Sequence, residues 1–163
     1  MRIFLASLLL IGGLSTAAAQ VRIDGADVLE TGLYKLGDTK TIEDRTISTG
    51  QRTESKTTLV RSTTLIQPKG PTVFGLELVV RGRPNGQSAQ VQVVWRYPEP
   101  GIRNPDTGTT KFTDQYMTQV EIGARQTYYW NMEDDWQMVP GEWIFELRNG
   151  NRTLVRQSFT LEK

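Results

Sequence analysis

The side chains best placed to do chemistry are the consecutive carboxylates of Glu133, Asp134 and Asp135. Calcium takes several oxygen ligands, often from adjacent carboxylates and loop carbonyls. Paired carboxylates also serve as acid and base in the cleavage of glycosidic bonds. Consecutive residues seldom aim at one point, however, so we interpret this run as a solvated loop. A cation site and a carboxylate-dependent hydrolase are the alternatives.

Two residue types that carry much enzyme chemistry are missing, because the chain contains no cysteine and no histidine. This excludes thiolate nucleophiles, Ser-His-Asp and Cys-His sites, and the usual zinc and copper ligand sets. We therefore expect no catalytic residue, no metal ligand and no cofactor, and we expect that the protein is not an enzyme.

Three aromatic residues, Tyr129, Trp136 and Tyr97, are candidates for an exposed platform that binds a sugar or a peptide. Aromatic side chains combine a large apolar area with one polar tip, which suits recognition. The alternative is that they pack in the core or within a hairpin. Tyr129 is the best candidate, because its parity along the strand opposes that of Tyr128 and Trp130. The predicted ligand-binding residues are therefore Tyr129 and Trp136.

Three arginines, Arg96, Arg148 and Arg156, lie on the outward parity of expected strands. They are expected to form ion pairs with Glu77 and Glu146, which also face outward. Exposed ion pairs contribute at most about 1 kcal/mol each, so we interpret these charges as a solvated face.

The stretch 128–147 contains three of the four tryptophans and must position both the acidic run and the candidates Tyr129 and Trp136. Residues 128–132 and 143–147 each alternate large apolar and other side chains, which predicts two strands that face one core. Residues 139–142, with the sequence VPGE, predict a tight turn, because proline presets φ and glycine supplies a positive φ.

Alternation also predicts strands elsewhere, whereas no stretch has the period of an amphipathic helix. Residues 29–34 suggest an edge strand with a glycine bend, and the polar segment 37–58 suggests two solvent-facing strands in a hairpin, with a mobile loop as the alternative. Asn149-Gly150 predicts a further hairpin turn. The clearest remaining strands are expected at 73–80, 91–97, 112–122 and 155–161.

The first 19 residues have the pattern of a signal peptide, with Arg2, an apolar run and a small-residue cleavage site before Gln20. Residues 20–163 then form one domain with 18 basic and 18 acidic side chains. A neutral domain gives no electrostatic reason to bind nucleic acid. No later run predicts a membrane span, and we expect a periplasmic or secreted monomer.

These short strands and turns predict an all-β, antiparallel β-sandwich. The segments 74–78, 94–98 and 136–143, within a span from about Ala26 to Leu161, resemble a family of uncharacterised exported bacterial proteins, domain of unknown function 3859. The resemblance implies an immunoglobulin-like sandwich in the periplasm or outside the cell, and it carries over no catalytic residue.

The resulting functional hypothesis is a non-catalytic interaction module that binds another envelope protein through a sheet edge or through loops at one end of the sandwich. The alternative is a module that binds a small ligand or glycan through Tyr129 and Trp136. A hydrolase that uses carboxylates alone ranks third.

Overall fold

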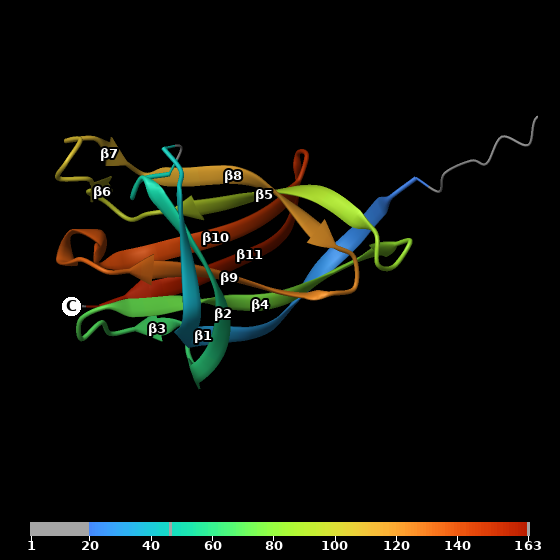
Figure 1. The fold of residues 1–163 in the computed structure, drawn as a ribbon, viewed down its shortest axis with the longest axis horizontal. Helices are drawn as coiled ribbons and strands as arrows, with labels where there is room; N and C mark the ends of the chain where they lie inside the picture. Colours follow the sequence, from blue (N-terminus) through green and yellow to red (C-terminus); the bar gives the residue numbers. More distant parts are fainter. Residues whose placement is uncertain (1–19, 46, 163) are drawn as a thin grey trace, which may run out of the picture.

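The computed structural model describes residues 20–45 and 47–162, and the expected signal peptide lies outside the described residues. Two β-sheets pack face to face (Figure 1), so the predicted all-β sandwich is confirmed. Sheet A contains β1 (Arg22–Glu43), β2 (Gln51–Ser62), β4 (Thr72–Arg83) and β9 (Arg125–Met132). Sheet B contains β3 (Leu65–Ile66), β5 (Ser88–Arg96), β8 (Thr113–Glu121), β10 (Gly141–Asn149) and β11 (Arg152–Leu161).

Strands β9 and β8 are edge strands of their sheets, and they border the same open side of the sandwich, because residues of both line one hollow there. The order in sheet A is β2-β1-β4-β9, and the order in sheet B is β3-β11-β10-β5-β8. Neighbouring strands pair in antiparallel fashion except β3, which pairs in parallel with β11. A small third sheet joins β6 (Ile102–Arg103) to β7 (Thr110–Lys111) in the segment between β5 and β8.

The core lies between the sheets and is rich in aromatic side chains. Phe74 of β4 contacts Trp95, Trp143 and Phe159 edge to face, with ring centroids 5.1–5.8 Å apart. Such contacts stabilise the folded state by more than the burial of their apolar area alone would. The inward parities predicted for residues 128–132 and 143–147 are confirmed, because their large apolar side chains are buried.

The connection between β9 and β10 differs from the predicted tight turn. The two strands belong to different sheets, and a short 3₁₀ helix, η1 (Asp135–Gln137), lies between them. Gly141 does have a positive φ of 128°, but it opens β10. The chain needs this longer crossing because β9 and β10 lie on opposite sides of the core.

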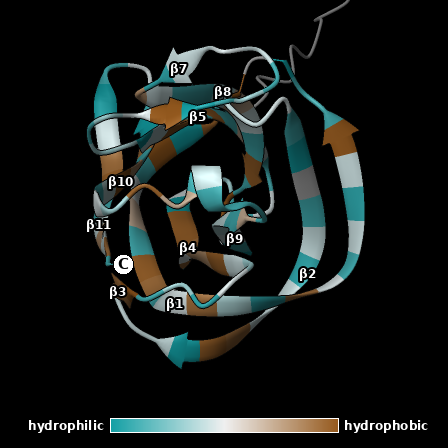
Figure 2. Ribbon diagram, turned by 90° about the vertical axis from the view of Figure 1, so that its left-hand side faces the viewer, coloured by the Kyte–Doolittle hydropathy of each residue, from teal (hydrophilic) through white to brown (hydrophobic). Residues whose placement is uncertain are grey.

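Strand β1 is central in sheet A, so the prediction of an edge strand at 29–34 is wrong. Its first half pairs with β4, and its second half leaves β4 and pairs only with β2. Residues 35–45 and 47–58 therefore form a two-stranded hairpin, as predicted for the segment 37–58, and we call this hairpin the arm. The arm bends out of sheet A and crosses the direction of β9 (Figure 1). Figure 2 shows it curving along one side of the sandwich towards β8.

No helix among the described residues is long and apolar enough to cross a membrane.

Candidate functional site

The tip of the arm is fastened to sheet B by buried hydrogen bonds. The backbone N–H and the Oγ hydroxyl of Ser48 both donate to Asp114 Oδ2, over 2.6 Å and 2.7 Å. The Asn104 side-chain amide donates to the carbonyl of Ser48 over 3.1 Å. Asp114 lies on β8 with its side chain only 1% exposed, and Lys111 Nζ lies 3.7 Å from its Oδ1. We call Ser48, Asn104 and Asp114 the latch.

A cavity of about 270 Å³ lies between the arm and the open side of the sandwich. The arm contributes residues around Arg52 and Glu54, β8 contributes Asp114 and Tyr116, and β9 contributes residues 127–131. The cavity exists because the arm spans from sheet A to sheet B without filling the space below it.

Five aromatic residues form much of the cavity wall. They are Trp95, Tyr116, Tyr128, Tyr129 and Trp130. Trp95 and Trp130 belong to the core, with ring centroids 6.0 Å apart, so the floor of the cavity is rigid. The guanidinium of Arg52 lies over the Tyr116 ring, 5.7 Å from its centroid. Arg52 also forms an ion pair with Glu54, in which Nη2 lies 3.3 Å from Oε1.

The phenols on this wall stay protonated at neutral pH. Burial raises the pKa of Tyr116 to about 12, although the nearby charge of Arg52 lowers it in part. Burial also raises the pKa of Tyr129, and the carboxylate of Glu54 adds to the shift. The wall therefore offers neutral hydroxyl groups beside aromatic faces.

Formal charge on the cavity wall is negative. Three lining residues, Glu54, Asp114 and Glu133, carry carboxylates, and one, Arg52, carries a guanidinium. Glu133 accepts a hydrogen bond from the Asn131 side chain over 2.8 Å. Like charges in a concave, partly apolar space attract counter-ions more strongly than the same charges on a flat surface.

The two predicted ligand-binding residues are separated by the structure. Tyr129 is half-buried and lines the cavity. Trp136 lies in η1, packs partly buried against the core and is not among the lining residues. Tyr97 is buried in the core, where its ring centroid lies 4.8 Å from that of Trp143. The three aromatic residues therefore do not form one platform.

The acidic run is also divided. Glu133 lines the cavity, whereas Asp134 and Asp135 are exposed at the start of η1. The Gln137 side-chain oxygen accepts the backbone N–H of Glu133 over 2.6 Å and shapes this turn. Among residues 20–45 and 47–162, no group of three or more acidic, histidine or cysteine side chains is arranged to hold a metal ion.

Sequence reasoning missed Arg52, Asp114 and Tyr116 as site residues. The sequence could have identified Asp114, because this carboxylate shares the parity of Phe112 and Tyr116 on a predicted strand. Inward charges are rare unless they are paired. Phe112, the first residue of the strand expected at 112–122, is exposed and lies just before β8 begins.

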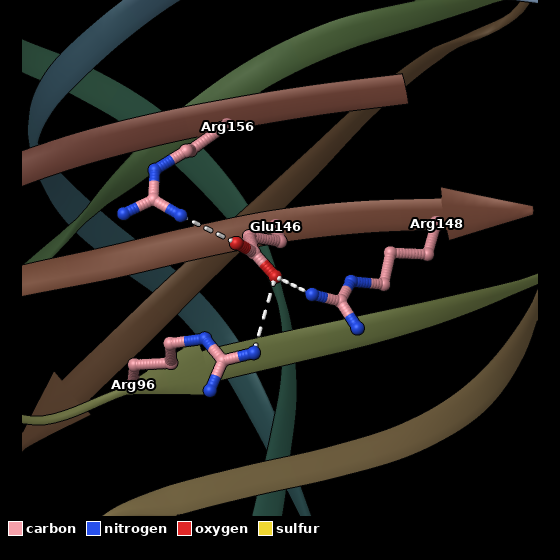
Figure 3. A network of polar contacts seen from close by, with 4 residues as sticks. All are labelled: Arg96, Glu146, Arg148 and Arg156. Carbon is pink, nitrogen blue, oxygen red and sulfur yellow. Dashed lines mark hydrogen bonds and ion pairs between the residues drawn. The ribbon is translucent and has the colours of Figure 1, made fainter. Parts of the chain in front are cut away.

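The predicted ion pairs of the outward arginines are present in part, and those of Glu146 are drawn in Figure 3. Glu146 itself is not solvated. Its side chain is only 3% exposed beneath Arg96, Arg148 and Arg156, which come from three neighbouring strands. Arg156 Nη1 donates to Glu146 Oε1 over 2.8 Å. Glu77 lies on the other sheet and pairs with Arg125 over 2.7 Å. The interpretation of this group as a merely solvated face is therefore wrong for Glu146.

The solved structure of an immunoglobulin-like protein from Pseudomonas aeruginosa is similar to this chain, with a TM-score of 0.60. It shares 23% sequence identity, and the match covers 90% of this chain and 99% of that one. The fold is thus an immunoglobulin-like β-sandwich. The family model described as "Domain of unknown function (DUF3859)" matches residues 24–161, and the chain belongs to this family, as the resemblance implied.

A β-glucosidase from Kluyveromyces marxianus matches at 13% identity with a TM-score of 0.32, over 82% of this chain and 14% of that one. A likeness at that level carries no argument about fold or function. No curated protein matches the sequence.

Proposed function

We propose that this protein is a non-catalytic, exported binding domain that holds a small polar molecule in the cavity below the arm. The observation that carries the proposal is the combination of five aromatic residues with four charged ones around a single hollow. Ligand sites are typically concave, mostly apolar, and equipped with a few polar groups that fix orientation. The periplasm or the cell exterior is the proposed location, on the strength of the leader-like residues 1–19.

The size of the cavity limits the ligand. At about 270 Å³ it is slightly below the range of about 300–1,000 Å³ that is common for drug-sized molecules. It suits one sugar unit, one amino acid or a molecule of similar size. A longer glycan or peptide would have to enter only by its end.

A buried donor on the wall favours a ligand that carries an acceptor. Trp130 Nε1 has no hydrogen-bond partner among the described residues. A buried donor without a partner costs about 1–3 kcal/mol. A hydroxyl or carbonyl group on a ligand would reduce that cost.

The test is titration of the purified domain with single sugars, amino acids, small amines and cell-wall fragments, followed by tryptophan fluorescence and calorimetry. Tyr129→Ala is expected to weaken binding about tenfold or more, since a well-packed aromatic contact contributes 1–2 kcal/mol. Trp136→Phe is the matched control, because Trp136 lies outside the cavity, and it should bind normally. Failure of every compound to change either signal would refute the proposal.

A second candidate, an interaction module, is favoured by strand β2. Among the described residues β2 pairs with no strand other than β1, so its outer edge, beyond the backbone contact of Ser55 with Tyr129, can accept an added strand. Retention of an envelope protein by the immobilised domain, lost when proline replaces Thr58, would support this candidate. Retention that is unaffected by the proline would count against it.

A further inference from the structure

One aromatic ring in the cavity, that of Tyr116, already contacts a cation. The Arg52 guanidinium lies 5.7 Å from the centroid of Tyr116, which is within the distance at which a cation is attracted to the negative face of a ring. Tyr129, Tyr128 and the two tryptophans add further rings around the same space. Groups of aromatic faces of this kind suit quaternary and substituted ammonium ions.

The charges of the wall act in the same direction. Glu54, Asp114 and Glu133 outnumber Arg52, so the lining residues carry a formal charge of about −2 at neutral pH. Two charged residues near the cavity do not line it, and their charges cancel. Lys111 lies 3.7 Å from Asp114, and the negative charge of Asp44 acts on Tyr116. The field inside the cavity therefore favours a positive ligand.

From these observations we infer that the ligand of the cavity is an organic cation, a substituted ammonium group held against Tyr116 and Tyr129 and neutralised by the surrounding carboxylates. This inference rests on the proposed function and names the chemical class of its ligand. In the unliganded protein Arg52 occupies the place of that cation. Binding then moves the guanidinium away from Tyr116 and leaves it paired with Glu54.

The competing possibility is a carboxylate-bearing ligand that binds to Arg52. Its guanidinium has a donor, Nε, without a partner among the described residues, and arginine pairs well with carboxylates. Such a ligand would, however, enter beside three carboxylates and would meet Arg52 already paired with Glu54. The two possibilities predict opposite effects for removal of the Arg52 charge.

The test compares three probes of nearly the same shape on the unmodified protein: choline, its uncharged isostere 3,3-dimethylbutan-1-ol, and the anion 3,3-dimethylbutanoate. We expect choline to bind about tenfold or more tightly than the alcohol, because a desolvated cation–π contact and the carboxylates act only on the charged probe. The anion should not bind measurably.

Arg52→Gln then shows whether the guanidinium competes with a cationic ligand or binds an anionic one. It should strengthen choline binding about threefold, because it removes a competing cation and frees Glu54. Glu133→Gln should weaken choline binding by a similar factor. Arg81→Gln is the matched control, since Arg81 pairs with Asp27 on the first part of sheet A and does not line the cavity.

Equal affinity for choline and the alcohol, or binding of the anion that Arg52→Gln abolishes, would overturn the cation inference. Either result would leave the binding function itself intact, because a ligand would still occupy the cavity. Absence of any binding by these probes and by the neutral sugars and amino acids would overturn both.

Discussion

Glu146 illustrates how burial changes the role of an ion pair. It lies on the outward side of β10, yet the three arginines above it exclude almost all solvent from its carboxylate. A carboxylate removed from water is costly unless charged hydrogen bonds compensate it. The arginines remain 31–57% exposed, so they keep much of their own hydration while they neutralise Glu146.

The first prediction concerns this group. Glu146→Gln keeps the size of the side chain but leaves three adjacent guanidiniums without a counter-charge. We expect the free energy of unfolding to fall by about 2–4 kcal/mol, measured by urea denaturation. Glu77→Gln removes one carboxylate from the more exposed pair with Arg125 and should cost no more than about 1 kcal/mol. Equal losses for the two variants would contradict the distinction.

The second prediction concerns alkaline pH. Burial raises the pKa of all five tyrosines of the chain, to about 12 for Tyr34 and Tyr116. The unfolded chain releases these protons near pH 10, whereas the folded chain retains them. The free energy of unfolding is therefore unaffected below about pH 10 and falls as the pH rises towards 12, by up to about 1.4 kcal/mol per pH unit for each fully buried tyrosine and by less for the partly exposed Tyr129.

Urea denaturation between about pH 8 and about pH 11, with tyrosinate absorbance recorded in parallel, checks this prediction. Tyr116→Phe should make the fall in stability less steep. Tyrosinate formation near pH 10 in a protein that keeps its full stability would show that the phenols are not protected by the fold.

Among the elements, the arm matters most for the proposed function, because it covers the cavity. It belongs to sheet A by its hydrogen bonds, but its tip is held by Asp114 and Asn104, which precede or begin β8. Within the part of the chain that the structure describes, no further strand pairs with the two-stranded part of the arm, because β1 leaves β4 at Tyr34. Its position over the cavity therefore depends on the latch and on contacts such as Arg52 with Tyr116.

The third prediction is that Asp114→Ala releases the tip of the arm. The substitution removes the acceptor for both the backbone N–H and the hydroxyl of Ser48, so the stability should fall by about 1–3 kcal/mol. Hydrogen exchange of the Ser48 amide should become much faster, while exchange in β10 changes little. Thr49→Ala, which removes only an exposed hydrogen bond to Gln51, is the control. Unchanged exchange at Ser48 in Asp114→Ala would show that the latch does not hold the arm.

The chain as a whole combines a neutral domain with an apolar leader-like segment, and the proposed location follows from this combination. The fourth prediction is that expression in a bacterium yields an exported protein whose first residue is Gln20, as determined by mass spectrometry of the intact chain. The substitution Ala19→Phe places a large side chain at the cleavage site and should block cleavage, because the site needs small residues. A protein that retains Met1 inside the cell would contradict the proposed location.

Much of the fold was predictable from local patterns. The alternation in residues 73–80 and 91–97 identified β4, β5 and their buried faces, and Asn149-Gly150 identified the turn between β10 and β11. The half-exposed position of Tyr129 followed from the same period of two. These features depend on residues close together in the sequence, because a strand turns successive side chains to opposite faces wherever it lies in the fold.

The cavity was not predictable in this way. Ser48 and Asp114 meet although 66 positions separate them, and Arg52 reaches Tyr116 only because the arm bends out of sheet A. Glu146 became buried through arginines on two other strands as well as its own. Such contacts depend on strand order and on the path of a bent hairpin, and alternation along one strand contains no information about which distant segment will cover it.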